Sequence, residues 1–321
     1  MVTNGLSRRS VVGLGLGAAA ALGSGSAAWA ARETFFMRTR LPIGLQLYTL
    51  GPGLASDLDG QLSQVAGIGY RTVEMAGYLG RTPKALRAAF DQAGLACVSS
   101  HVQGRPTGAD PSLADLDRLI ADAHVIGIRS LVLPMFPVPE HISTTPQPGE
   151  DRRAVLGRLA AQMTLDDWKA TADLLNTKGA ALKAAGLQLG YHNHNVEFAP
   201  VGGTTGLDFL LANTDPAVVH FEMDAGWVVA AGHDPLALLK AHPHRFRQMH
   251  VKDVKATTKP NFAFQQDPTE VGSGIIDWKR LLAASYAAGV RDFFVEQEPP
   301  FEKLRLEAVK VSFDHLKALV A

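Results

Sequence analysis

The sequence of 321 residues contains a single cysteine, Cys97, which lies in an apolar stretch. One cysteine cannot form a disulfide within the chain, so the disulfide-stapled scaffolds of small secreted proteins are excluded. A free cysteine in such a stretch is typically a small, buried core residue.

Net charge is also absent, because 31 lysines and arginines balance 31 aspartates and glutamates. A neutral chain lacks the basic surface of a nucleic-acid-binding protein, and it carries no acidic tail. The hydrophobic fraction of 46% is enough for one large core, and no shift in composition marks a second domain. We therefore predict one catalytic domain over residues 31–321, a length that suits a single barrel of about 250 residues.

The chain has no long, uninterrupted hydrophobic run. Its most apolar N-terminal stretch, 11–23, is short and rich in glycine and alanine, which disfavours a membrane-spanning helix. Arg8 and Arg9 precede it, and the small-residue sequence at 28–30 is typical of a cleavage site. Residues 1–30 thus resemble a bacterial twin-arginine signal, which predicts export to the periplasm without stable membrane insertion.

The rest of the chain alternates strand-like and helix-like patterns. Apolar runs predict eight strands, at 43–48, 72–75, 96–100, 130–134, 188–192, 218–224, 248–252 and 293–296. Apolar residues spaced by three and four predict helices at 58–67, 83–94, 113–127, 165–186, 235–241, 278–288 and 304–320. Strict alternation indicates a parallel sheet, and with eight strands it predicts an α/β (β/α)8 TIM barrel.

Two connections are unusually long, 136–165 and 254–274. Both follow strands, so both are expected over the mouth of the barrel as lids or pocket walls. The alternatives are a surface excursion or, for the first, a contact between the copies of a homodimer.

Acidic and histidine side chains stand at the ends of the last three predicted strands. Asp224, His250 and Glu296 are suitable ligands for one divalent ion, Mn, Zn, Co, Mg or Fe. Glu222 shares a face with Asp224, and its position fits a buried, paired carboxylate as well as a ligand.

The fifth strand ends in two histidines, His192 and His194, which point to the same face in an extended segment. One is expected to complete the metal site, and the other to bind substrate or transfer protons. Glu197 lies just beyond and is a second candidate for the pocket.

Four more polar residues suit acid–base chemistry. Glu74 and His101 end strands two and three, opposite the predicted metal site. Lys252 follows His250 on the same face and is suited to stabilise an oxyanion, and Glu298 follows Glu296 in the same way.

A glycine-containing turn, 271–278, follows the second long loop. Asp277 is expected to cap the helix that begins at 278. The turn is a candidate for phosphate binding through backbone N–H groups, but no basic residue flanks its glycines directly, which favours a structural role.

These motifs also carry a family resemblance. Residues 42–319 resemble the sugar phosphate isomerase/epimerase superfamily, the xylose-isomerase-like TIM barrels that include endonuclease IV and inosose dehydratase. The most specific segments are 182–198, 224–235, 250–253, 271–278 and 295–298.

In that family a metal is typically held by Glu, Asp, His and Glu from strands five to eight. The resemblance implies that Asp224, His250 and Glu296 are the last three ligands. The first departs, since His192 stands where many members have Glu, so the strand-five ligand is either His192 or Glu197. Trp227 replaces the usual histidine after Asp224, and it is expected to form an aromatic wall for the sugar or to pack in the core.

The resemblance and the residues together predict a metal-dependent isomerase or epimerase. The metal would acidify a C–H beside a carbonyl and, with Lys252, stabilise the enediolate. Loss of a β-substituent from the same intermediate would make the protein a lyase acting on a keto-sugar, cyclitol or 3-keto-glycoside. Two other hypotheses are a sugar-binding barrel without catalysis and, against the neutral charge, a phosphodiesterase resembling endonuclease IV.

Overall fold

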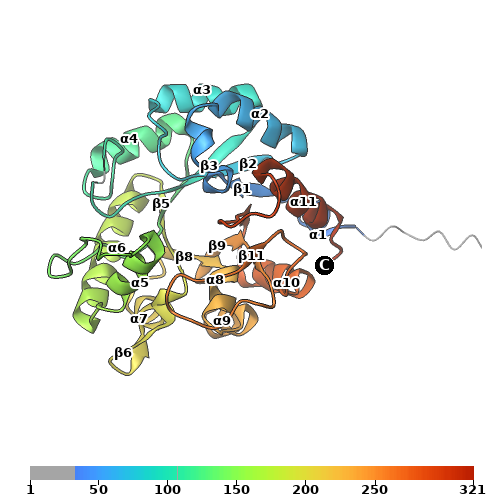
Figure 1. Cartoon of the computed structure of the whole chain (residues 1–321). Coiled ribbons are helices and arrows are strands. Elements are labelled where there is room, and N and C mark those ends of the chain that lie inside the picture. Colours follow the sequence, from blue (N-terminus) through green and yellow to red (C-terminus); the bar gives the residue numbers. More distant parts are fainter. Residues whose placement is uncertain (1–32, 107) are drawn as a thin grey trace, which may run out of the picture. The chain divides into compact units, whose positions relative to one another are not determined.

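A closed eight-stranded barrel forms the centre of the protein (Figure 1). This computed structural model describes residues 33–106 and 108–321. All neighbouring strands of the barrel are parallel, which confirms the predicted (β/α)8 fold. In order around the barrel, the strands are β1 (Gly44–Gln46), β12 (Asp292–Val295), β9 (Phe246–Val251), β8 (Val219–Asp224), β5 (Gln188–His192), β4 (Ser130–Leu133), β3 (Ala96–His101) and β2 (Thr72–Met75).

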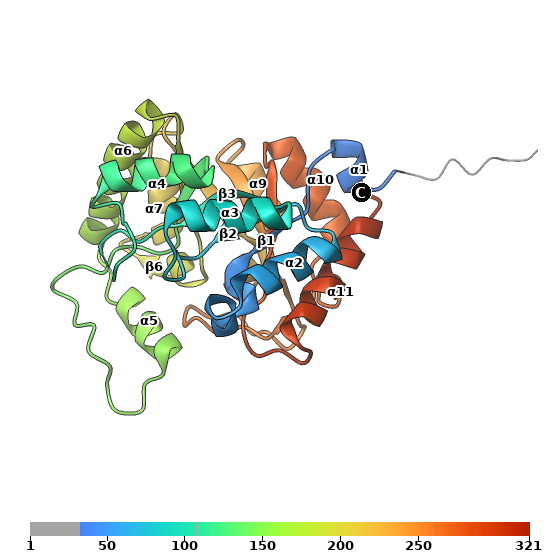
Figure 2. The ribbon, with the colours of Figure 1, turned by 90° about the horizontal axis from the view of Figure 1, so that it is seen from above.

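Helices surround the barrel, as Figures 1 and 2 show from two directions. They are α1 (Phe35–Thr39), α2 (Leu58–Ile68), α3 (Pro83–Ala93), α4 (Leu116–Ile126), α5 (Arg152–Ala160), α6 (Leu165–Ala184), α7 (Gly206–Asn213), α8 (Ala225–Ala230), α9 (Pro235–Ala241), α10 (Trp278–Ala288) and α11 (Arg305–Ala318). None of the helices in the described ranges combines the length and the hydropathy needed to cross a membrane. The predicted signal at 1–30 lies outside the described residues.

Several predicted boundaries were wrong for local reasons. The first strand was predicted to reach residue 48, but it ends at Gln46, whose side chain accepts a hydrogen bond from Tyr48 N and turns the chain into a 3₁₀ helix, η1 (Leu47–Leu50). Helix α7 escaped prediction altogether; it begins after Thr205, which caps it.

Both long connections contain secondary structure. The first includes α5, which stands with its preceding loop on one side of the barrel (Figure 2). The second includes a hairpin of β10 (Asp253–Val254) and β11 (Pro268–Thr269). A smaller hairpin, β6 (Pro200–Val201) with β7 (Thr204–Thr205), follows the 3₁₀ helix η3 (Val196–Phe198), and another 3₁₀ turn, η2 (Pro52–Ala55), precedes α2.

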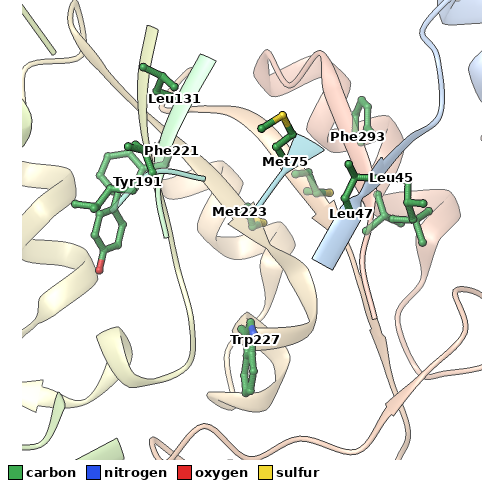
Figure 3. Close-up of a cluster of buried hydrophobic side chains, with 14 of the residues drawn as sticks. Leu45, Leu47, Met75, Leu131, Tyr191, Phe221, Met223, Trp227 and Phe293 are labelled. Atoms are coloured by element: carbon green, nitrogen blue, oxygen red, sulfur yellow. The ribbon is translucent and has the colours of Figure 1, made fainter. Parts of the chain in front are cut away.

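The core is mostly apolar, and Figure 3 shows part of it, including Leu45, Met75, Phe221 and Phe293. Cys97 is buried, as expected. Cross-barrel hydrogen bonds show that the barrel interior itself is partly polar. Ser130 on β4 donates to the Gln248 side chain on β9, a strand that is not its neighbour, at 2.7 Å.

Candidate active site

Ionisable side chains from six barrel strands meet at the carboxyl ends of the strands. Because all eight strands are parallel, these ends lie at one rim of the barrel, where the catalytic groups of such barrels are found. The residues that meet there are Glu74, His101, His192, Glu222, Asp224, His250, Lys252, Glu296 and Glu298.

The side chains form two groups that could each hold a metal ion and that share His250. We call the first the histidine group; it consists of His101, His192, Glu222 and His250. We call the second the carboxylate group; it consists of Asp224, His250 and Glu296. The predicted ligands are therefore divided, with His192 in the first group only and Asp224 and Glu296 in the second only.

Glu222 lies at the centre of the histidine group. Its Oε2 atom is 3.1 Å from His101 Nε2, 3.0 Å from His192 Nδ1 and 3.1 Å from His250 Nε2. The other oxygen, Oε1, is buried and has no hydrogen-bond partner among the described residues. The sequence signal for Glu222 was its position two residues before Asp224, on the same face of the strand.

The three histidines of this group differ in their electrostatic surroundings. Burial acts to lower the pKa of His101, but Glu74 and Glu222 raise it to about 9. His250 is likewise shifted upward, because the surrounding carboxylates outweigh burial in setting its pKa. His192 has a pKa well below its ordinary value, owing first to burial and then to the neighbouring His250. The site thus places two histidines with raised pKa values beside one whose pKa is lowered.

Lys252 occupies the space between the acids of the carboxylate group. Its Nζ atom is 2.7 Å from Asp224 Oδ2 and 2.7 Å from Glu296 Oε2, and it donates a hydrogen bond of 2.8 Å to Glu298. The lysine side chain is fully buried. Burial acts to lower the pKa of Lys252, but the three carboxylates raise it, so the group is a fixed ammonium.

Glu74 lies beneath the site and is fully buried. It accepts hydrogen bonds from Gln46 and Ser99, and it lies 2.7 Å from His250 Nε2. Burial acts to raise the pKa of Glu74, but His101 and His250 bring it well below its ordinary value. Its contacts suit a carboxylate that orients His250, since Glu74 does not line the cavity above the site.

A cavity of about 900 Å³ opens above these groups. His101, His192, His194, Glu296 and Glu298 form part of its wall. Both long loops contribute to it, the first through Asp151, Arg152, Arg153 and Leu156 and the second through Phe264. The arginines were missed in the sequence, where an adjacent pair in a loop after a strand was the available signal.

His194 and Glu197 have separate positions. The ring of His194 faces the cavity, and its Nδ1 atom has no hydrogen-bond partner among the described residues. Glu197 is fully buried, accepts from the Tyr191 hydroxyl at 2.9 Å and from His194 N at 2.8 Å, and belongs to neither metal-binding group. Glu197 therefore fixes the turn after β5.

Trp227 packs behind the site and is 1% exposed. Figure 3 shows it on helix α8, within a cluster of buried hydrophobic side chains. Its indole N–H donates to Glu298 at 3.2 Å, and the Lys252 ammonium lies 5.2 Å from its ring centroid. Since Trp227 is absent from the cavity wall, the structure favours the packing role over a wall for the sugar.

In the glycine turn at 271–278, backbone N–H groups donate to the side chain of Asp253. Asp253 accepts backbone hydrogen bonds from Gly272, Gly274 and Ile276, and it also accepts from the indole of Trp278. These donors are therefore already engaged, which speaks against phosphate binding there. Asp277 caps α10 as predicted.

The residues at the rim fit a divalent metal ion. Glu222 Oε1 is buried without a hydrogen-bond donor among the described residues, and a carboxylate oxygen in this condition is costly unless a cation is close, whereas Asp224 Oδ2 already has the Lys252 ammonium 2.7 Å away. Lys252 forms an ion pair with Asp224, but it makes no contact with Glu222. The donors are imidazole nitrogens and carboxylate oxygens, which suit Zn, Mn, Fe or Co.

Comparison with known proteins agrees with the barrel fold. The family described as xylose isomerase-like TIM barrel matches residues 62–319. The chain is similar to a solved sugar phosphate isomerase/epimerase from Parabacteroides distasonis ATCC 8503, with 28% identity and a TM-score of 0.68 over 86% of this chain and 97% of the other.

Curated relatives match over shorter stretches. An inosose dehydratase of Geobacillus thermodenitrificans is 33% identical over 156 residues, which is 43% of this chain and 52% of the relative. Another, from Geobacillus kaustophilus, is 26% identical over 209 residues, 64% of this chain and 65% of the relative. The chain thus spans between about half and two thirds of the length of these relatives.

Proposed function

Because the chain belongs to the xylose isomerase-like TIM barrel family, we propose that it is a metal-dependent, sugar-modifying lyase. Its substrate would be a keto-sugar, a keto-cyclitol or a 3-keto-glycoside that loses water or another β-substituent. The observation that carries this proposal is the cluster of histidines and carboxylates at the rim, of which His101, His192 and Glu296 line a cavity of about 900 Å³. A cavity of this size accommodates a sugar ring together with a substituent.

A divalent ion held at this rim by residues of either metal-binding group would polarise a substrate carbonyl and make the neighbouring C–H more acidic. The protein must then supply a group that removes the proton. His194 is the candidate, because its side chain lines the cavity and remains 17% exposed, while its buried Nδ1 atom lies on the side of Glu197, 3.9 Å from Oε1. Glu74 and Lys252 are fully buried and off the cavity wall, so both suit positioning roles.

Elimination requires a proton at the departing oxygen as well. His194 becomes an imidazolium when it removes the C–H proton, and it can return that proton to a leaving oxygen on the same face of the ring. The C–H and C–O bonds break, a carbon–carbon double bond forms beside the carbonyl, and water or an alcohol leaves. One histidine is sufficient for this chemistry. The names of the two curated relatives, both inosose dehydratases, also support it.

Isomerisation or epimerisation is the second candidate, which the similar Parabacteroides protein favours by its name. Epimerisation through one carbon needs acid–base groups on both faces of the substrate. Glu298 is the available second group, since it lines the cavity and is only half-buried. Where many members of the family have a strand-five glutamate, this chain has His192, and the Nδ1 atom of His192 contacts Glu222. An epimerisation that uses this glutamate as one of its two acid–base groups is therefore less well supported here.

The test is a panel of keto-sugars, keto-cyclitols and 3-keto-glycosides, incubated in D₂O with the full chain and added Mn²⁺. Elimination would produce the ultraviolet absorbance of an enone, while epimerisation would introduce deuterium without that absorbance. We expect His194→Gln to lower kcat at least about 100-fold, and the exposed control His124→Gln to leave it unchanged. Sugar binding without turnover or deuterium exchange would contradict the enzyme hypothesis and favour a binding barrel.

A further inference from the structure

Both metal-binding groups contain His250. The carboxylate group also includes acids that pair with Lys252, whereas the histidine group has no such lysine or arginine among the described residues. His250 approaches the histidine group through Nε2 and the carboxylate group through Nδ1. A ligand imidazole binds one ion through one nitrogen, and the other nitrogen then donates to a neighbouring acceptor. The surroundings of each group therefore decide which nitrogen faces the metal.

The carboxylate group already contains a cation. The Lys252 ammonium lies within 2.8 Å of oxygens from Asp224, Glu296 and Glu298. The lysine side chain is fully buried and packs closely against Gly226, where an added Cβ would lie only 2.8 Å from its Cγ atom. A divalent ion on the same oxygens would meet the repulsion of this fixed positive charge.

The histidine group, in contrast, contains a carboxylate without a paired lysine or arginine in the described part of the chain. Its carboxylate, Glu222, makes no ion pair with any lysine or arginine of the described residues, and Oε1 has no donor there. The three ring nitrogens lie 3.0 to 3.1 Å from Glu222 Oε2. Ligand atoms around an ion with bonds of about 2.1 Å are separated by roughly 3 to 3.5 Å, so little rearrangement is required.

We propose that the divalent ion binds in the histidine group, to His101, His192, Glu222 and His250 Nε2, while Lys252 remains the cation of Asp224, Glu296 and Glu298. His250 Nδ1 then donates to Glu296, 2.9 Å away. When His250 Nε2 binds the metal, it gives up its contact with Glu74. Glu74 keeps the hydrogen bonds that it accepts from Gln46 and Ser99. The site differs from the set implied by the family resemblance in using His101 and Glu222 in place of Asp224 and Glu296.

This inference rests on the metal dependence proposed above, and metal binding tests it without any substrate. The full chain is stripped with chelator and titrated with Mn²⁺, and the coordinated imidazole nitrogens are counted by pulsed electron paramagnetic resonance. We expect three such nitrogens in the wild type and two in His101→Gln. Zinc X-ray absorption provides an independent count.

Two matched glutamine variants separate the groups. Glu222→Gln removes a proposed ligand and is expected to weaken Mn²⁺ binding at least about 1000-fold. Glu296→Gln removes only the partner of a ligand and is expected to cost about 10- to 100-fold. Glu140→Gln, at an exposed glutamate, is the control, and circular dichroism checks the fold of each variant.

The outcomes distinguish this inference from the proposed function. An ion in the carboxylate group would show one imidazole, that of His250, or two if His192 also binds, with the same count in wild type and His101→Gln. That count, with binding lost in Glu296→Gln and retained in Glu222→Gln, would overturn the inference alone. Failure of the wild type to bind Mn²⁺, Zn²⁺, Co²⁺ or Fe²⁺ would overturn both the inference and the metal-dependent function.

Discussion

Histidines in the barrel differ in protonation because their neighbours differ. His101 has a pKa raised to about 9 by Glu74 and Glu222, although burial opposes the shift. His220 lies deeper in the barrel, where burial lowers its pKa to about 4. It contacts the side chains of Gln248 and Ser130 and, within 33–106 and 108–321, forms no ion pair with a carboxylate. Glu74 and Glu222 thus keep His101 cationic, whereas His220 is neutral in a polar but uncharged part of the interior.

The neutral state of His220 predicts an acid-sensitive fold. Its pKa in the folded protein lies below the ordinary value of 6.5, so the stabilisation is complete above pH 6.5 and is lost as the pH falls towards 4. We expect His220 to account for about 2 kcal/mol of the free energy of unfolding lost between pH 7 and pH 5.

Urea unfolding at both pH values, for wild type and His220→Gln, measures this contribution. The variant should be less stable at pH 7 but should lose less stability on acidification. The exposed His124→Gln variant should behave as wild type. An equal loss in wild type and His220→Gln would contradict the assignment.

At the scale of elements, the two long loops after the strands are held in place by specific hydrogen bonds and ion pairs. The first long loop brings α5 to the cavity, where Arg153 donates to Pro299 O at 2.6 Å and lies 3.6 Å from Glu298. The second is fixed by Asp253, whose carboxylate collects donors from the glycine turn. Both loops thus shape the cavity through contacts that join distant parts of the chain.

Asp253 allows a test of this second loop. Asp253→Ala leaves four backbone N–H groups, those of Val254 and of three residues in the glycine turn, and the Trp278 indole without this acceptor. We expect it to lower the free energy of unfolding by about 3 to 5 kcal/mol, since each buried, unpaired donor is costly. Asp277→Ala, in the same turn, loses only a helix cap and should cost about 1 kcal/mol. Equal losses in urea unfolding would show that Asp253 acts merely as another cap.

At the scale of the whole molecule, the export signal predicted at 1–30 can be tested separately. If Arg8 and Arg9 direct twin-arginine export, the double variant Arg8→Lys/Arg9→Lys should remain in the cytoplasm, because that pathway recognises the arginine pair. Fractionation of a bacterial host that expresses the full chain measures this. The control Arg38→Lys/Arg40→Lys, outside the leader, should be exported normally. Export of both proteins, or of neither, would contradict the prediction.

The sequence by itself determined the barrel and the residues near its mouth. Alternating strands and helices are local patterns, and parallel strands must bring their polar ends to one rim, so His192, Asp224, His250 and Glu296 could be expected together. Helix α7 could not be predicted as readily, because its eight residues give a weak periodic signal.

Only the tertiary structure decided how these residues pair. Lys252 lies among three acids, Glu222 lies among three histidines, and Trp227 is behind the site, and none of these relations follows from spacing along the chain. The physical reason is that side-chain contacts across a barrel join residues distant in sequence, and their geometry depends on the packing of every strand between them.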